Sequence, residues 1–115
     1  MFTVKWTPEA QAAYDRLKAK AEASLVARKK KAKPKTSKDE GLFKQVHKTA
    51  RLLASNPRHP GLATHEFHSL PHPYDARQKV FEVYAQSRTP GAYRVFWCYG
   101  PGKKEITIIA ITPHP

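Results

Sequence analysis

The stretch that decides the fold is AYRVFWCYGPGKKEITIIAITPHP, residues 92–115. Two of its segments, Tyr93–Tyr99 and Ile106–Ile111, are rich in β-branched and aromatic residues, which is typical of β-strands. Gly100-Pro101-Gly102 lies between them and is a turn sequence, so the two strands are expected to form an antiparallel hairpin. Both strands are apolar on both faces, which indicates central positions in a sheet.

Further strands are predicted on either side of this hairpin. Residues 80–85 form another β-rich run, and Thr89-Pro90-Gly91 links it to the hairpin by a short turn, so the three strands should form an antiparallel meander. Residues 2–6 are a short apolar run that indicates an N-terminal strand. Residues 59–76 are rich in proline and histidine and predict a loop around a short extended piece at 64–70.

Two amphipathic helices are predicted between the first strand and the meander. Thr7 suits a helix N-cap and Pro8 the first helical position. Ser37 and Glu40 have the spacing of a capping box, and Asn56-Pro57 ends the helix that they begin. Apolar residues follow at helical spacing, which predicts one buried face on each helix. They are Ala10, Ala13, Tyr14, Leu17, Ala21 and Leu25 in the first helix, and Leu42, Phe43, Val46, Ala50 and Leu53 in the second.

The predicted architecture is α+β, in the order β-α-α-β-β-β. An N-terminal helical hairpin packs on one face of a small antiparallel sheet, and the other face stays partly open. The 115 residues fit a single domain over 1–115. Residues 28–38, RKKKAKPKTSK, carry seven Lys and Arg and no acid. Their mutual repulsion and Pro34 predict an extended, mobile basic connector at the tip of the hairpin.

Charge is the strongest compositional feature. Lys and Arg number 21 against nine Asp and Glu, which gives a net charge of +12. Solubility alone requires a net charge of only about 2 to 8. The excess therefore predicts a polyanionic partner, which is nucleic acid, the ribosome or an acidic protein.

Several classes of protein are excluded. No apolar run approaches the roughly 18 to 20 residues that a membrane span requires, so we expect no membrane partner. The first residues lack the basic-then-apolar order of a signal peptide, and we expect a cytoplasmic protein. The lone Cys98 excludes an internal disulfide framework and a cysteine-based zinc site. Histidines at 59, 65, 68 and 72 lie in a segment without a regular helix to fix their spacing, so we predict no metal site.

Four segments together resemble a known family. They are the strand-to-helix step VKWTPEA (residues 4–10), the helix end LLASNPR (52–58), the Tyr93-Arg94 strand and the final apolar strand. In order, length and charge they resemble the RelE/ParE superfamily of toxins from type II toxin–antitoxin pairs. The resemblance covers nearly the whole chain except the basic connector, which is longer than usual for the family.

The resemblance implies one of two activities, and a decayed or repurposed member that only binds RNA or an antitoxin-like partner is a third alternative. Many members cut messenger RNA, often on the ribosome, whereas the ParE branch poisons DNA gyrase. It also implies a cognate antitoxin that wraps around the toxin. We therefore expect an antitoxin as partner, together with messenger RNA and the ribosome or, alternatively, DNA gyrase. No cofactor is expected.

Metal-independent RNA cleavage needs a proton acceptor for the 2′-hydroxyl, a cation for the phosphorane and a proton donor for the leaving 5′-oxygen. Arg94 alternates with apolar residues of its strand, so it should point to the open face, and it matches the arginine that follows tyrosine in the family. It is the candidate phosphate ligand. An arginine that merely covers the sheet with its aliphatic stem is the alternative.

The resemblance to YoeB-like members implies two further catalytic residues. His114, at the end of the last strand, would act as acid or base. Glu66, within HEFHSL, would act as base. Pro115 replaces the aromatic residue that follows the histidine in such members. A frayed terminus for His114 and a surface carboxylate for Glu66 are the alternatives.

Other residues could share these roles. Glu82 is a rival for the base. RelE proper uses lysines on the strand before the Tyr-Arg strand, and only Lys79 stands there, which favours acid–histidine chemistry. Tyr84 either stacks on a base or is an ordinary strand residue. The candidate RNA-binding residues are Lys29, Lys30, Lys31 and Arg77.

Overall fold

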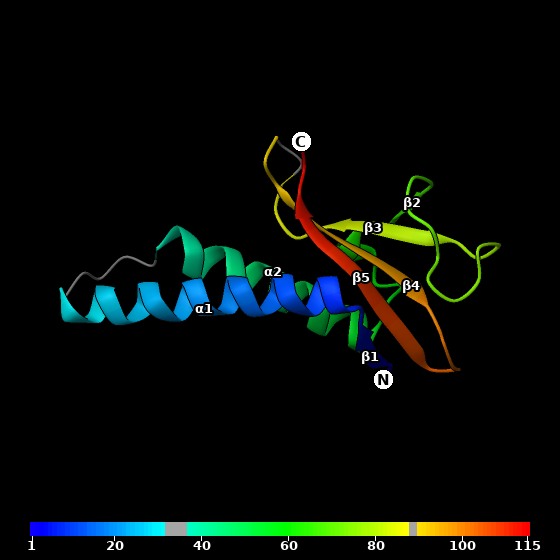
Figure 1. Cartoon of the computed structure of the whole chain (residues 1–115), viewed down its shortest axis with the longest axis horizontal. Coiled ribbons are helices and arrows are strands. Elements are labelled where there is room, and N and C mark those ends of the chain that lie inside the picture. Colours follow the sequence, from blue (N-terminus) through cyan, green and yellow to red (C-terminus); the bar gives the residue numbers. More distant parts are fainter. Residues whose placement is uncertain (32–36, 88–89) are drawn as a thin grey trace.

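The computed structural model describes residues 1–31, 37–87 and 90–115, and it confirms the predicted α+β fold (Figure 1). The elements are β1 (Thr3–Trp6), α1 (Pro8–Lys30), α2 (Lys38–Ser55), the short 3-10 helix η1 (Pro60–Leu62), β2 (His65–Phe67), β3 (Val80–Tyr84), β4 (Tyr93–Tyr99) and β5 (Glu105–Pro113).

The strands form one sheet in the order β1-β5-β4-β3-β2. The antiparallel meander of β3, β4 and β5 is confirmed, and β4 and β5 lie inside the sheet as predicted. β2 adds an antiparallel edge beside β3. At the other edge β1 pairs with β5 in parallel, because the chain returns from β1 through the whole helical hairpin before it enters the meander.

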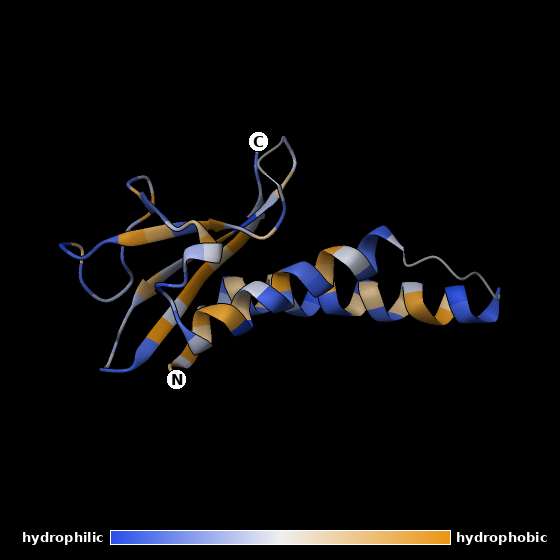
Figure 2. Ribbon diagram, turned by 180° about the vertical axis from the view of Figure 1, so that it is seen from behind, coloured by the Kyte–Doolittle hydropathy of each residue, from blue (hydrophilic) through white to orange (hydrophobic). Residues whose placement is uncertain are grey.

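The two helices pack on one face of the sheet and on each other. Their predicted apolar faces supply buried Ala10, Leu17, Val46 and Leu53, which meet Trp97 of β4 in a single core. Figure 2 shows the hydrophobic strands at the centre of the body, with mixed hydropathy along the helices. Burial of such apolar faces is the main stabilising contribution to the fold.

The start of α1 is tied directly to the sheet. Thr7 is the N-cap and its hydroxyl accepts a hydrogen bond from the backbone N–H of Ala10 at 3.2 Å. The same hydroxyl donates to the carbonyl oxygen of Ile109 in β5 at 2.6 Å. The predicted N-cap is therefore confirmed, and it also fixes the angle at which α1 leaves the sheet.

The basic connector is shorter than predicted. Arg28, Lys29 and Lys30 lie in the last turn of α1 and Lys31 caps it, so the prediction of an extended segment from residue 28 is wrong for these four positions. Positive charge is favourable at a helix C-terminus, which offsets the repulsion on which the prediction rested. Residues 32–36 lie outside the described part of the chain, and Lys38 already belongs to α2.

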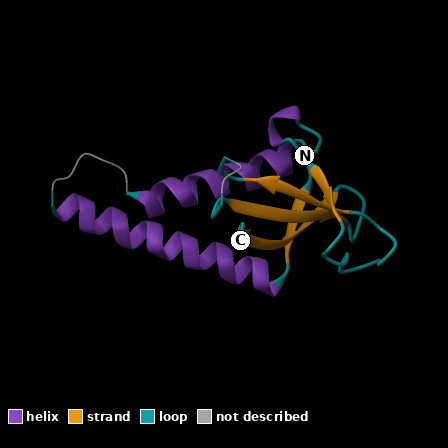
Figure 3. Ribbon diagram, turned by 90° about the horizontal axis from the view of Figure 1, so that it is seen from above, coloured by secondary structure: helices purple, strands orange, loops and turns teal. Residues whose placement is uncertain are grey.

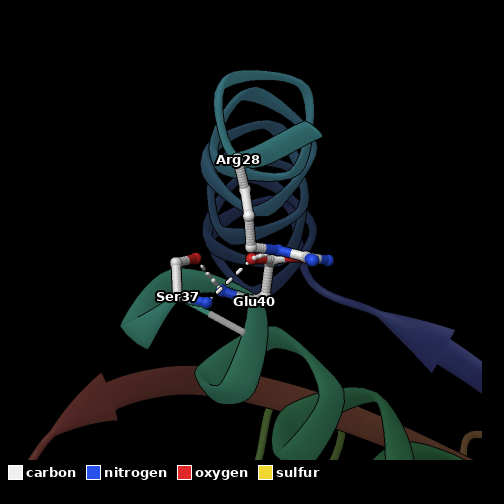
Figure 4. Close-up of polar contacts among 3 residues, drawn as sticks. All are labelled: Arg28, Ser37 and Glu40. Atoms are coloured by element: carbon white, nitrogen blue, oxygen red, sulfur yellow. Dashed lines mark hydrogen bonds and ion pairs between the residues drawn. The ribbon is translucent and has the colours of Figure 1, made fainter. Parts of the chain in front are cut away.

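An ion pair joins the two helices near the tip of the hairpin (Figure 4). Arg28 Nη2 lies 2.9 Å from Glu40 Oε1, and Arg28 Nε lies 3.1 Å from Oε2. Glu40 Oε2 also accepts the backbone N–H of Ser37 at 2.8 Å, which completes the predicted capping box. The hydrogen bonds from Arg28, followed by that from Ser37, lower the pKa of Glu40 to about 2.

The hairpin projects beyond the sheet along the 51 Å long axis of the molecule (Figures 1 and 3). Among the described residues no helix combines the length and apolarity needed to cross a membrane. The helices pack on one face of the sheet and leave the other face uncovered by helices.

Candidate functional site

The strand register separates the two faces of the sheet. Residues paired across antiparallel strands point to the same side. Val83 and Val95 pair and are buried against the helices. Their neighbours Glu82, Tyr84 and Arg94 therefore point to the opposite, open face, as the alternation in β4 predicts for Arg94.

Arg94 and Glu82 form an ion pair on this open face. Arg94 Nη1 lies 3.0 Å from Glu82 Oε2, and only 13% and 12% of the two side chains are exposed. The guanidinium lies over the ring of Phe96, 4.8 Å from its centroid, and the ring of Phe67 in β2 also packs on Phe96 with centroids 4.6 Å apart. The guanidinium is therefore held in place by a carboxylate and an aromatic floor.

The donors of Arg94 are incompletely used. A guanidinium carries five N–H donors. Within the described part of the chain, the contact of Nη1 with Glu82 is the hydrogen bond that this side chain makes, and Nε is buried without a partner. A buried donor without an acceptor is unfavourable by roughly 1–3 kcal/mol. An anion that joins Arg94 on this face would supply acceptors for its remaining donors.

His114 lies against Tyr84, which pairs with Arg94 across β3 and β4, and its backbone is hydrogen-bonded to the turn before β4. Its backbone N–H donates to Ala92 at 2.7 Å and its carbonyl accepts from Gly91 at 2.9 Å, so the end of β5 is tied to the turn before β4. The imidazole stacks on Tyr84 with centroids 6.2 Å apart. Nδ1 lies 2.9 Å from the carbonyl oxygen of Pro115, which can only accept, so Nδ1 donates and Nε2 carries the lone pair in the neutral ring.

Glu66 lies on the other face. It pairs in register with Phe81, which packs on Trp97 on the helix side of the sheet. Its carboxylate lies 3.8 Å from Lys79 Nζ and 3.9 Å from His68 Nδ1. The structure thus brings Arg94, Glu82, Tyr84 and His114 together but separates Glu66 and Lys79 from them.

A residue that the sequence reasoning missed takes the place expected for Glu66. His65, one position earlier, pairs with Glu82 and points to the open face. Opposite residues in such a pair have Cβ atoms about 4.5–5.5 Å apart. His65 is visible in the sequence beside Glu66, but a shift of one residue exchanges the two faces of a strand. Only the strand register could therefore show that His65, and not Glu66, lies on the side of Glu82.

The candidate RNA-binding residues lie in two separate places. Lys29, Lys30 and Lys31 are exposed at the end of α1, at the far end of the hairpin from the sheet (Figure 1). Arg77 lies in the loop between β2 and β3, where its Nε is 3.1 Å from Asp75 Oδ1 and lowers the pKa of that carboxyl. These charges can attract a polyanion but do not belong to the Arg94 cluster.

The remaining histidines of the loop have structural partners. Nδ1 of buried His72 accepts the backbone N–H groups of Tyr74 and Asp75, both at 3.1 Å, so its Nε2 donates to the carbonyl of Tyr99 at 2.9 Å. His59 Nδ1 accepts from Gly61. No three His, Cys, Asp or Glu side chains of the described residues are arranged to hold a metal ion. Burial raises the pKa of the Cys98 thiol to about 11, which leaves it a weak nucleophile.

Solved structures share this fold. A YoeB/ParE toxin from Agrobacterium tumefaciens is 10% identical, with a TM-score of 0.59 over 98% of this chain and 99% of that one. The YoeB dimer from Staphylococcus aureus is also 10% identical, with a TM-score of 0.60 over 99% and 98%. No protein-family model and no curated protein sequence matches the chain. At this identity the likeness concerns the backbone, and it establishes that the chain has the fold of the YoeB/ParE toxins.

Proposed function

We propose that the protein is the toxin of a type II toxin–antitoxin pair and cleaves messenger RNA on the open face of its sheet. The observation that carries the proposal is the Arg94 guanidinium, which is fixed by Glu82 and Phe96 yet retains unused donors beside a held histidine. The fold shared with YoeB/ParE toxins supports the toxin class. The net charge of +12 favours a polyanionic substrate.

In the proposed reaction Arg94 binds the scissile phosphate. A base removes the proton of the 2′-hydroxyl, the 2′-oxygen attacks phosphorus and the bond from phosphorus to the 5′-oxygen breaks. An acid protonates the departing 5′-oxygen. The products are a 2′,3′-cyclic phosphate and a 5′-hydroxyl, and Arg94 stabilises the charge that develops on the phosphorane.

His114 and His65 are the proposed proton-transfer groups. The lone pair on Nε2 of neutral His114 suits it to accept a proton, and its protonated ring can return one. Glu82 is a poorer base because its carboxylate is engaged by Arg94. Its proposed role is to position the guanidinium. His65 is exposed beside Glu82 and can approach a phosphate bound to Arg94 from the β2 side.

The proposal also includes partners. A cognate antitoxin, messenger RNA and the ribosome are the partners that this toxin class would require, and DNA gyrase is the alternative target. The experiment compares cleavage of messenger RNA by the purified protein, with and without translating ribosomes, against supercoiling by purified gyrase. Cleavage with intact supercoiling supports the proposal, whereas inhibited supercoiling without cleavage overturns it.

The residue assignment is tested in the same assay. Arg94→Gln should reduce the cleavage rate by about 100-fold, as expected when a donor to a developing oxyanion is removed. Arg16→Gln is the matched control, because it removes the same charge from an exposed position of α1 and should change the rate little. Equal rates in the two variants would refute the role of Arg94.

A further inference from the structure

A pocket lies on the helix side of the sheet, beside the turn that follows α2. It has a volume of about 540 Å³. Phe81 alternates with Glu82, so this pocket and the Arg94 cluster lie on opposite faces of the sheet. The lining residues are Pro57, Arg58, Thr64, Phe81, Trp97 and Tyr99.

Three aromatic rings form the floor of this pocket. Phe81 stacks on Trp97 with centroids 4.8 Å apart and an interplanar angle of 29°. Tyr99 meets Trp97 edge-on at 5.0 Å and Phe81 edge-on at 5.9 Å. Trp97 is 1% exposed, whereas Tyr99 is 39% exposed. The pocket therefore offers accessible aromatic surface above a rigid, buried indole.

Two buried polar atoms in the lining have no partner. Among the described residues three buried side-chain atoms lack a hydrogen bond, and two of them, Trp97 Nε1 and Thr64 Oγ1, belong to residues that line this pocket. The third is Nε of Arg94, in the proposed cleavage site. Native proteins leave few buried polar atoms unpaired. An indole N–H can only donate, so the missing partner of Trp97 is an acceptor.

The rim of the pocket is positive. Arg58 is exposed, and no described carboxylate lies within ion-pair distance of it. Lys104 Nζ lies 5.8 Å from the Phe2 ring, which packs on Tyr99 at 6.1 Å. Glu66 points to the same side of the sheet, but its carboxylate lies beside Lys79. An anionic group is thus favoured next to the aromatic floor.

We propose that this pocket binds a nucleotide. Its base lies against Phe81 and Tyr99, above the buried indole of Trp97, and the phosphate pairs with Arg58. Aromatic surface with a neighbouring arginine is a common platform for unpaired bases, and the volume falls within the range of ligand sites, about 300–1,000 Å³. The site lies outside the cleavage site proposed above. A free nucleotide and a single-stranded RNA share this chemistry.

The test follows the two indole N–H resonances of the ¹⁵N-labelled protein, those of Trp6 and Trp97, during titration with AMP, GMP, CMP and UMP. We expect a saturable shift of the Trp97 resonance with at least one nucleotide, while the Trp6 resonance stays in place. Arg58→Ala should weaken the affinity about tenfold or more, because a charge-assisted bond is lost. Arg51→Ala, which removes the same charge from the exposed side of α2, is the matched control and should bind as the wild type does.

A short single-stranded RNA in the same titration distinguishes the two ligands that share this chemistry, a free nucleotide and an RNA strand. Tighter binding than the mononucleotides identifies an RNA strand, and equal binding identifies a free nucleotide; both support the site. A Trp97 resonance that does not move with either ligand at millimolar concentration overturns the proposal. So does a shift that is the same in Arg58→Ala. Because Arg94→Gln leaves this pocket intact, failure of the cleavage proposal does not affect the result.

Discussion

Two arginine–glutamate pairs, one in the helical hairpin and one on the sheet, have similar burial but different bonding. In the hairpin, the Arg28 and Glu40 side chains are 23% and 8% exposed, and on the sheet those of Arg94 and Glu82 are 13% and 12% exposed. Arg28 bonds both oxygens of Glu40 through Nε and Nη2, and Glu40 also accepts the N–H of Ser37. Arg94 bonds Glu82 through Nη1, and its Nε is buried without a partner.

The difference separates a pair that holds the fold from one suited to bind a ligand. A two-pronged arginine–carboxylate contact whose carboxylate also accepts a backbone N–H leaves little for a ligand to gain. A guanidinium that is already held rigidly and still has unused donors is preorganised for an anion. Binding then does not have to restrict the motion of the side chain, so the entropic cost of binding is smaller. The same two residue types therefore serve stability at the hairpin tip and, in our proposal, chemistry on the open face.

The largest expected effect comes from a change that keeps the charge of Arg94. In Arg94→Lys an ammonium group replaces the planar guanidinium, and we expect the RNA cleavage rate to fall by about 100-fold. Arg28→Lys is the matched control and should cleave at the wild-type rate. Rates are measured with equal concentrations of folded protein. Full activity in Arg94→Lys would mean that the bonding geometry of this arginine is unimportant.

A smaller effect is expected from Tyr84, whose ring packs on His114. Tyr84→Ala should slow cleavage about threefold to tenfold, because a stacked aromatic pair contributes about 0.5–1.5 kcal/mol and orients the imidazole. Tyr84→Phe preserves the ring and should retain more activity than Tyr84→Ala. The cleavage rate of each variant is the measurement, and an equal loss in both would assign the effect to the hydroxyl instead.

Loss of the hairpin pair should change stability and leave the chemistry intact. Arg28→Ala leaves the Glu40 carboxylate without its guanidinium, so we expect unfolding at lower denaturant concentration with an unchanged dependence on denaturant. Cleavage per folded molecule should equal that of the wild type. A loss of cleavage comparable to that of Arg94→Lys would show that the two pairs do not differ in the way proposed.

The smallest effect is a difference in acid stability. The pKa of Glu40 is about 2 in the folded protein against an ordinary value of 4.5. A lowered pKa stabilises the fold above the ordinary value, and this contribution is lost as the pH falls from about 4.5 to 2. The unfolding free energies of the wild type and Glu40→Gln should therefore differ most above pH 4.5 and converge towards pH 2. A difference that stays constant across this range would contradict the assignment.

The sequence predicted the fold more fully than the site. Local signals sufficed for the cap at Thr7, the capping box of Ser37 and Glu40, and the meander of β3, β4 and β5, because each depends on neighbours in the chain. The parallel pairing of β1 with β5 depends on residues about a hundred positions apart, for which no local pattern exists.

The prediction of the candidate site was limited in the same way, because it depended on how separate segments of the chain are aligned. The direction of Arg94 followed from alternation within one strand, which the structure bears out. Which of His65 and Glu66 faces it depended on the register of a three-residue strand, and such a strand has no pattern long enough to fix its register. The ion pair of Arg94 with Glu82 likewise required the alignment of β3 with β4.

The most direct test of the central claim, that the open face cleaves RNA through the 2′-hydroxyl, uses one substrate and its chemical variant. The wild-type protein is given an RNA with a mapped cleavage site and the same RNA with a single 2′-deoxy nucleotide immediately 5′ of the scissile phosphate. We predict a 2′,3′-cyclic phosphate product from the first RNA, no cleavage at that position of the second, and cleavage of the first RNA about 100-fold more slowly by Arg94→Gln. Equal cleavage of both substrates, or cleavage by Arg94→Gln at the wild-type rate, would contradict the claim.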